Sequence, residues 1–389
     1  MEHPVLTGAD RLRELESATL KGKRFGLLTC PTGVDSNLRS TIEICAGLAT
    51  AKLSALFACE HGIRGDRQAG VKIPDEIDPE TGLRVYSLYG EHTKPTKEML
   101  EGLDAIVFDT QDLGVRFYTY LSTLVYVMEA CAEHRVEVVV LDRPNPLGGE
   151  TSEGGYLRDE FHSMVGAWRM PIRTGLTIGE FARFVRDRMA NPCELQVVPL
   201  LHWKRSMEYP DTGLPWLPPS PNIPTMEAAR VYPGNCLFEG TNLSEGRGTT
   251  KPFEWIGAPW LNARQVCDSL NRQNLPGVLF HPVAFTPYIS KHRNELCHGI
   301  MTLVKDKRAY RSVPTGLRLL QAVQRAHPDE FRWVKPDFEG SRYFIDLLSG
   351  SDRVRLTLHE EGAVESIVGE WERDCADWDR IRGAYHMYD

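Results

Sequence analysis

The sequence lacks the features typical of membrane-spanning and nucleic-acid-binding proteins. No apolar stretch approaches the ~18 residues that span a bilayer. The net charge is −8, and no basic cluster is longer than residues 21–24, which argues against a nucleic-acid partner. Residues 1–6 contain no basic segment followed by an apolar run, so a signal peptide is not predicted. We expect a cytoplasmic protein, or a periplasmic or secreted one if a leader has been removed.

Cysteine and histidine occur without the spacings of a metal or redox site. The nine cysteines include no C-x-x-C pair, and the twelve histidines include no H-E-x-x-H motif. We therefore expect no metal and a reducing compartment. No predicted strand leads into G-x-G-x-x-G, and no segment has the G-x-x-x-x-G-K-[ST] spacing. The sequence therefore predicts that no cofactor is bound.

Short aliphatic segments alternate with amphipathic ones in the first 150 residues. The aliphatic segments, which predict strands, are 24–29, 53–58, 105–109 and 137–142. Helical spacing of apolar residues is found at 40–51, 94–102 and 122–135. A capping box at Thr177 predicts a further helix over 177–189, followed by a strand at 194–200. This alternation is typical of a doubly wound parallel sheet with helices on both faces.

A second unit follows a proline-rich stretch at 214–224. That stretch predicts an ordered irregular segment beside a cleft, because proline is excluded from helix interiors and inner strands. The elements expected beyond it are a helix at 262–273, strands near 278–285 and 300–304, a helix after Pro314 and a helical tail at 366–388 packed across this unit. We predict an α/β protein with a Rossmann-like N-terminal catalytic domain (1–255) and a smaller C-terminal α/β domain (256–389).

Polar side chains follow the predicted strands of the first unit. Cys30 follows the first strand, and the other candidates are Glu60, His61 and Arg64 after the second, Asp112, Arg116 and Tyr118 after the third, and Arg143 and Asn145 after the fourth. Because the carboxyl ends of strands in a doubly wound sheet share one edge, we expect these groups to converge on one crevice. The glycine-rich segment 238–250 adds Glu239, Asn242, Glu245 and Arg247. Together they predict a site for a polar substrate.

Carboxyl groups, amides and hydroxyl groups without a cofactor motif favour carbohydrate chemistry. Glycosidic bonds are usually cleaved by two carboxyl groups, one protonated and one ionised. We predict Glu60 as the general acid, with Glu239 or Glu245 as its partner and Asp112 behind them. His61 has two interpretations, a neighbour of the catalytic acid or a packed imidazole.

The sequence resembles the exo-β-N-acetylmuramidases of bacterial cell-wall recycling, a glycoside hydrolase family long catalogued as a domain of unknown function. The matching segments are 26–35, 57–66, 78–90, 108–124, 141–149, 219–225 and 232–254, with weaker similarity from 285–306 to the tail. The resemblance implies a Rossmann-like domain, a smaller α/β domain and an active site in the cleft between them. It also implies release of terminal N-acetylmuramic acid from the non-reducing end of peptide-free glycans.

The resemblance also bears on individual residues. The family's leading catalytic candidate is the glutamate of an E-H-G-x-R-G motif, here Glu60, and Cys59 replaces the usual proline before it. A lactyl carboxylate on the substrate favours a guanidinium in the site. The candidates for binding substrate are Arg64, Asp112, Arg116, Tyr118, Arg143, Asn145, Asn222, Asn242 and Arg247. The alternatives are a Rossmann-type transferase or amide hydrolase on cell-wall fragments, and a non-catalytic muropeptide- or sugar-binding protein.

Overall fold

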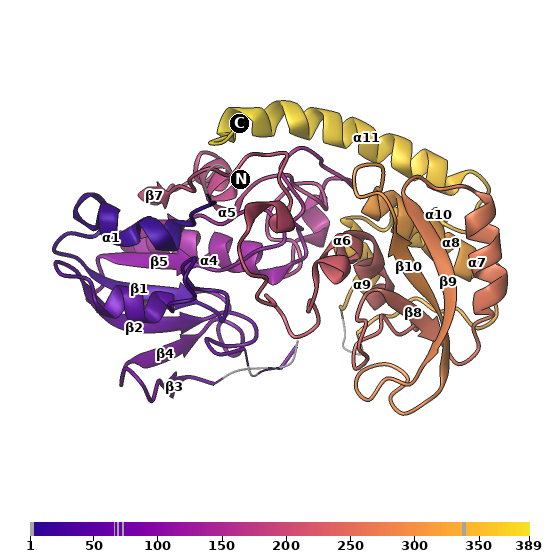
Figure 1. Ribbon diagram of the computed structural model, residues 1–389, viewed down its shortest axis with the longest axis horizontal. Helices are drawn as coiled ribbons and strands as arrows, with labels where there is room; N and C mark the ends of the chain where they lie inside the picture. The colour runs from indigo at the N-terminus through magenta and orange to yellow at the C-terminus, as the bar shows by residue number, and fades with distance from the viewer. Residues whose placement is uncertain (1–3, 66, 68–69, 72–73, 337–339) are drawn as a thin grey trace.

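The computed structural model describes residues 4–65, 67, 70–71, 74–336 and 340–389 (Figure 1). Asp66, the last residue of the motif at 57–66, lies outside the described residues, as do residues 1–3 of the N-terminal segment. The chain forms two parts that lie side by side, and the last long helix runs along both of them (Figure 1).

A seven-stranded sheet forms the centre of the N-terminal part. Its strands are β1 (Arg24–Thr29), β2 (Lys52–Ala58), β3 (Glu76–Ile77), β4 (Arg84–Ser87), β5 (Ala105–Asp109), β6 (Glu137–Leu141) and β7 (Leu195–Val198). The order across the sheet is β3-β4-β2-β1-β5-β6-β7. Neighbouring strands are parallel except for β3, which runs antiparallel to β4. The predicted doubly wound parallel sheet is confirmed, although β3 and β4 were not predicted.

Helices cover both faces of this sheet because its strands are apolar on both sides. The helices of one face are α1 (Gly8–Thr19) and α2 (Thr41–Ala46), and those of the other are α3 (Lys97–Leu100), α4 (Thr119–His134) and α5 (Ile178–Arg186). Leu27 of β1 packs in the α1–α2 core, whereas its neighbour Leu28 packs in the opposite core. Alternating burial of this kind is expected of a strand covered on both faces.

The helix boundaries differ from the predicted ones where tertiary contacts intervene. Helix α2 ends at Ala46 rather than at residue 51, because the N–H groups of Ala49 and Thr50 bind the carboxylate of Glu16 in α1. Helix α4 begins at Thr119, three residues earlier than predicted. The capping box predicted at Thr177 is confirmed at the start of α5.

A three-stranded antiparallel sheet forms the smaller part. Its strands are β8 (Trp255–Ala258), β9 (Val278–Phe285) and β10 (Cys297–Val304), in the order β8-β10-β9. Its helices are α6 (Met226–Asn235), α7 (Ala263–Arg272), α8 (Ser312–Ala326), α9 (Phe344–Ser349) and α10 (Arg353–Thr357). The backbones of α6 and α8 approach closely at Gly234 and Gly316. Helix α6, which precedes residue 255, therefore packs in the smaller part. The boundary predicted between residues 255 and 256 stays a prediction.

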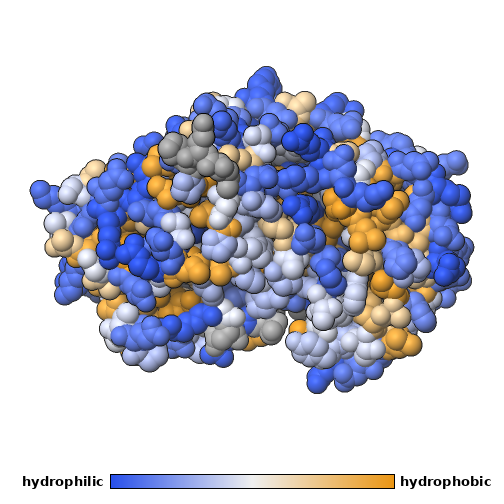
Figure 2. All heavy atoms as spheres, in the orientation of Figure 1, coloured by the Kyte–Doolittle hydropathy of each residue, from blue (hydrophilic) through white to orange (hydrophobic). Residues whose placement is uncertain are grey.

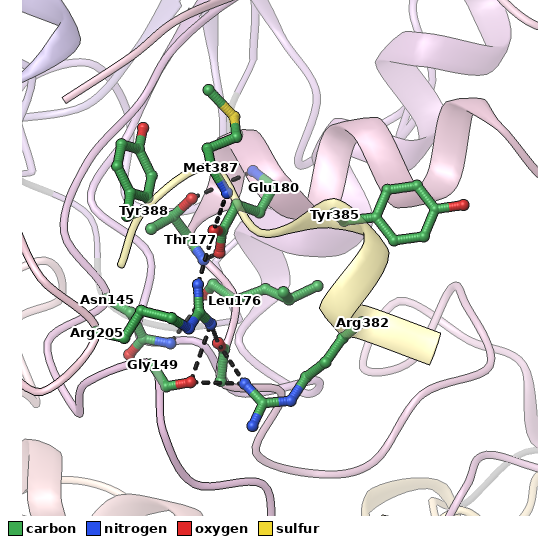
Figure 3. A network of polar contacts seen from close by, with 12 residues as sticks. Asn145, Gly149, Leu176, Thr177, Glu180, Arg205, Arg382, Tyr385, Met387 and Tyr388 are labelled. Carbon is green, nitrogen blue, oxygen red and sulfur yellow. Dashed lines mark hydrogen bonds and ion pairs between the residues drawn. The ribbon is translucent and has the colours of Figure 1, made fainter. Parts of the chain in front are cut away.

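The C-terminal helix α11 (Ala363–Arg382) joins the two parts. It begins against α8 and α10 and ends against the N-terminal part, where Trp378 Nε1 donates to the Thr174 carbonyl at 2.8 Å. Arg382 donates to the carbonyl oxygens of Gly149, Glu150 and Gly175 at 2.6 to 2.9 Å, and Figure 3 shows the bond to Gly149. The tail was predicted to pack across the smaller part, and the structure shows that it spans both.

The described residues also contain the 3-10 helices η1 (Asp159–Phe161), η2 (Tyr209–Thr212), η3 (Cys236–Gly240) and η4 (Gly383–Tyr385). Within the described ranges, no helix is long and apolar enough to cross a bilayer. Nor do the described residues contain a group of three or more His, Cys, Asp or Glu side chains that could hold a metal ion. The cysteines are unpaired, and those predicted as core residues, Cys45, Cys131 and Cys267, are buried.

Candidate active site

A cavity of about 560 Å³ is lined by residues from both parts of the chain. In space-filling form, the molecule is hollowed at its lower edge between the two parts (Figure 2). The polar lining residues are Glu60, His61, Tyr89, Tyr118, Thr119, Ser220, Asn222, Tyr232, Glu239, Glu245, Arg247, Ser290 and Lys291. Most of them come from loops, and the scaffold that holds these loops is the pair of sheets.

Glu60 enters this cavity from the end of β2. His61 and Gly62 both have left-handed backbone conformations, with φ of 77° and 78°, and turn the chain sharply after Glu60. The Thr119 hydroxyl, at the start of α4, donates to Glu60 Oε2 at 2.7 Å. The Gly70 N–H donates to Oε1 at 3.0 Å. The Glu60 carboxyl is thereby fixed by two neutral donors in the wall of the cavity.

Two further carboxylates, Glu239 and Glu245, share one guanidinium. Arg247 is hydrogen bonded to Glu239 through Nη2 and through Nε, the latter at 3.2 Å, and its Nε lies 3.2 Å from Glu245 Oε1. Burial lowers the pKa of Arg247, but the two carboxylates outweigh burial and raise it above its usual range. Arg247 therefore stays charged and holds both glutamates in place.

Lys291, from the loop between β9 and β10, anchors this cluster from the other side. Its Nζ lies 3.0 Å from Glu245 Oε2 and donates to the carbonyls of Phe238, Glu239 and Leu243 at 3.0 to 3.2 Å. Burial raises the pKa of Glu245, but Lys291 and Arg247 outweigh burial and hold it below its usual value. Glu245 is 3% exposed and Glu239 is 18% exposed, so Glu239 is the carboxylate of the pair that is more open to the cavity.

Aromatic rings form an apolar wall of the same cavity. Tyr232 packs edge-to-face against Phe117, Tyr118 and Phe253, with ring centroids 5.5, 6.0 and 4.7 Å apart. Tyr89 also lines the cavity, and burial together with the nearby charges of Glu60 and Glu239 raises the pKa of its hydroxyl. The Tyr89 phenol therefore stays protonated near both carboxylates.

His61 lines the cavity with a largely buried ring. Its Nδ1 lies 2.9 Å from the Arg67 carbonyl oxygen, to which it donates in the neutral tautomer. Burial lowers the pKa of His61, in spite of the opposing effect of Glu60. This geometry favours a neutral imidazole that holds the loop after Glu60.

Three residues expected after β5 and β6 are buried away from the cavity. Arg116 is fully buried, and its guanidinium donates to the carbonyls of Gly155, Met170 and Leu348 at 2.7 to 2.8 Å. Arg143 pairs with Asp109 at 2.6 Å, and Asn145 donates to the Leu176 carbonyl at 2.9 Å (Figure 3). The expected convergence of four strand ends is therefore partial. Glu60 after β2 and Tyr118 after β5 reach the cavity, whereas Arg116, Arg143 and Asn145 bind other protein groups.

Three more predicted residues also lie outside the cavity lining. Arg64 pairs with Asp78 and Glu80. Asn242 donates to the Glu330 carbonyl and accepts from the Arg332 N–H, both at 2.9 Å. Asp112 is buried, its Oδ2 accepts from the Gly114 N–H, and burial raises its pKa to about 7. We do not place these residues in contact with substrate.

The structure adds residues that the sequence analysis missed. Thr119 and Tyr89 lie near Glu60, and Ser220, Ser290 and Lys291 line the cavity beside the other candidates. Tyr89, Thr119 and Ser220 lie within segments already singled out, at 78–90, 108–124 and 219–225, and Ser290 and Lys291 lie within the weaker match at 285–306. The role of Lys291 was not predictable, because it depends on carbonyl groups that are more than 45 residues away in sequence.

Both parts of the chain match a known family and solved structures of the same fold. Residues 25–227 match the family described as exo-beta-N-acetylmuramidase NamZ, N-terminal, and residues 230–388 match its C-terminal counterpart. The peptidoglycan beta-N-acetylmuramidase NamZ of Bacillus subtilis strain 168 is 44% identical over 384 residues, which cover 99% of this chain and 91% of that protein.

Crystal structures of two DUF1343 family proteins of Bacteroides fragilis NCTC 9343 share the fold. One is 38% identical with a TM-score of 0.90 and covers 99% of both chains. The other is 30% identical with a TM-score of 0.76, and covers 100% of this chain and 99% of its own. The resemblance seen in the sequence is thus confirmed over both parts, and the chain belongs to the exo-beta-N-acetylmuramidase NamZ family.

Proposed function

We propose that this protein is an exo-acting glycoside hydrolase that releases N-acetylmuramic acid from the non-reducing end of peptidoglycan-derived glycans. The observation that carries the proposal is one cavity lined by Glu60 and by the Glu239–Arg247 pair. Membership of the family and the activity in the name of the Bacillus subtilis relative support it.

The two carboxyl groups differ in their surroundings, as glycosidic cleavage requires. Glu60 is contacted by a hydroxyl and a backbone N–H, and we assign it the role of general acid. It donates a proton to the glycosidic oxygen while the bond from that oxygen to C1 breaks. Water then bonds to C1, and the proton that water loses returns to the Glu60 carboxylate. Glu239 is held beside the Arg247 guanidinium and stabilises the positive charge that develops on the sugar ring.

The lactyl carboxylate of N-acetylmuramic acid needs a positively charged partner in the cavity. Of the four arginines considered, Arg247 alone is among the residues that line the cavity, and it already contacts two carboxylates. Lys291 also lines the cavity and contacts Glu245. We therefore propose that the lactyl carboxylate binds beside Arg247 and Lys291, where it competes with the glutamates that pair with these two cations.

The test is hydrolysis of a chromogenic N-acetylmuraminide, with free N-acetylmuramic acid identified as the product. Glu60→Gln keeps the shape of the side chain but removes the proton donor, so we expect at least a 100-fold loss in kcat with unchanged thermal unfolding. Wild-type protein that binds the glycoside without releasing the sugar would contradict the proposal and support a binding protein instead. Unchanged turnover in Glu60→Gln would overturn the assigned role.

A further inference from the structure

We propose that Asn222 binds the 2-acetamido group of the sugar in the catalytic cavity and so sets the preference for N-acetylated substrates. This inference rests on the proposed function, and it adds the group that the site recognises and the residue that recognises it. Asn222 is almost fully buried, lies in a proline-rich segment, and has a side-chain amide without a partner among the described residues.

Asn222 is 5% exposed and lines the same cavity as Glu60 and Glu239. Its backbone N–H donates to Ser220 Oγ at 3.3 Å, but its side-chain amide makes no hydrogen bond to any residue in the described part of the chain. The amide nitrogen and oxygen are not fully enclosed by protein, so both are open to the cavity that Asn222 lines. An unpaired amide in a cavity wall therefore indicates a group that awaits a ligand.

The charged side chains that line the cavity are already bound to other protein groups. Glu239, Glu245, Arg247 and Lys291 are bound to one another or to backbone carbonyls. Glu60 is bound to Thr119 and to the Gly70 N–H. The Asn222 amide thus differs from these residues in having all of its side-chain hydrogen-bonding capacity free.

The segment that carries Asn222 is held in one conformation. Prolines occupy positions 218, 219, 221 and 224, which restricts the backbone on both sides of Asn222. The Ile223 N–H donates to the Ser220 carbonyl at 2.9 Å. The Tyr120 hydroxyl, from α4, donates to the Pro219 carbonyl at 2.9 Å and lies 3.5 Å from the Glu60 carbonyl oxygen. Tyr120 therefore links the position of the amide to that of the catalytic glutamate.

A carboxamide is chemically matched to an acetamido group. Asn offers one carbonyl acceptor and an NH₂ donor, which complement the N–H and C=O of the substrate amide. The methyl group of the acetamido substituent needs an apolar surface. Ile223 and Tyr232 supply one, since both line the cavity and are at most 7% exposed.

The preference follows from the cost of leaving a buried amide unpaired. A substrate with a hydroxyl in place of the acetamido group cannot satisfy both the donor and the acceptor of Asn222, and a site built to form such bonds discriminates strongly against it. Removing the Asn222 amide should therefore weaken the reaction of the acetamido substrate and leave that of the hydroxyl analogue nearly unchanged.

The experiment compares kcat/KM for two chromogenic glycosides that differ only in bearing a 2-acetamido or a 2-hydroxyl group. We expect Asn222→Ala to lower kcat/KM for the first by roughly 100-fold and for the second by less than threefold. Asn222→Asp keeps the hydrogen-bond acceptor and loses the donor, so it should also reduce the preference for the 2-acetamido glycoside over the 2-hydroxyl one. Asn37→Ala, an exposed residue in the loop between β1 and α2, is the matched control and should behave as wild type.

A second measurement does not depend on turnover. The Glu60→Gln protein should bind N-acetylmuramic acid at least 10-fold more tightly than de-N-acetylated muramic acid, and adding Asn222→Ala should abolish that difference. Equal losses for both glycosides, or a preference that survives in Asn222→Ala, would overturn the inference. Wild type that hydrolyses neither glycoside but still shows the binding difference would overturn the proposed function and leave this inference standing.

Discussion

Glu239 and Glu245 share Arg247 and lie six residues apart, yet they differ in exposure and in the number of their cationic partners. Glu245 contacts both Arg247 and Lys291 and is nearly buried, whereas Glu239 contacts Arg247 and is more exposed. A buried glutamate with two cationic partners is suited to holding a loop in place. A glutamate with one such partner and an open face is suited to chemistry.

This difference predicts that a glutamine substitution lowers mainly the activity at Glu239 and mainly the stability at Glu245. Glu239→Gln should lower kcat by 100-fold or more and leave the free energy of unfolding nearly unchanged. Glu245→Gln removes the carboxylate shared by the partly exposed Arg247 and Lys291, so it should lower the free energy of unfolding by about 1–3 kcal/mol. Steady-state kinetics and urea unfolding of both variants check the prediction, and equal effects on stability would contradict it.

Asp112 provides a pH-dependent prediction. Burial raises its pKa in the folded protein to about 7, compared with about 3.9 in the unfolded chain. The folded state therefore holds a proton that the unfolded state releases between these values, so stability falls as pH rises from about 4 to 7, by at most about 1.4 kcal/mol per pH unit. Asp112→Asn should remove the contribution of this group to the fall of unfolding free energy with pH.

Urea unfolding at pH 5 and pH 8 measures the effect of Asp112. Asp187→Asn, a matched substitution at an exposed aspartate just after α5, should keep the wild-type slope. A slope in Asp112→Asn equal to that of wild type would show that Asp112 does not titrate in this range.

At the scale of elements, the loop between β9 and β10 reaches from the smaller part to the catalytic cavity. Ser290, His292 and Asn294 have left-handed φ values of 66°, 55° and 63°, which are unfavourable for residues other than glycine. Lys291 lies among them and donates to three backbone carbonyls as well as to Glu245. The contacts of Lys291 offset the strain of the loop.

Lys291→Met keeps the length of the side chain and removes the ammonium group. We expect at least a 10-fold loss of kcat/KM and a loss of about 2–3 kcal/mol in the free energy of unfolding, because buried carbonyls and Glu245 lose a partner. Lys305→Met, an exposed lysine just after β10, is the control and should change neither quantity. Wild-type activity in Lys291→Met would show that the loop does not depend on this anchor.

The strands were more predictable than the helices. β1 and β5 have the predicted ends, because an apolar run flanked by polar residues marks a buried strand directly. The end of α2 was not predictable, because it depends on the Glu16 carboxylate, which lies in another helix. Likewise, Arg143 resembles a ligand-binding residue in sequence, and only the position of Asp109 shows that the two side chains pair.

At the scale of the whole molecule, α11 controls how the two parts are joined. Arg382 binds three carbonyl groups of the N-terminal part, and Arg205 adds bonds to Glu180 and to the Gly149 carbonyl beside it (Figure 3). Because the catalytic cavity is lined by both parts, this junction also affects the geometry of the site.

Arg382→Met should uncouple the two parts. Loss of three buried hydrogen bonds from a charged donor should cost about 3–5 kcal/mol, and calorimetry should show a lower Tm with the single unfolding transition broadened or split. Arg380→Met is the matched control, because Arg380 is 80% exposed and pairs only with Asp377 at the surface. We expect the control to change stability by less than about 0.5 kcal/mol. A wild-type melt for Arg382→Met would contradict the prediction.

The sequence by itself determined the fold class, the strand that ends at Glu60 and the membership of the family, because these depend on local apolar patterns and on long contiguous motifs. Tertiary structure alone decided which polar residues share the cavity. Arg116 and Arg143 are held outside the cavity by the Met170 carbonyl and by Asp109, whereas Arg247 is held in the cavity wall by Glu239. No local sequence pattern predicts these partners. The same holds for Asn222, whose significance is that nothing else in the described chain binds its amide.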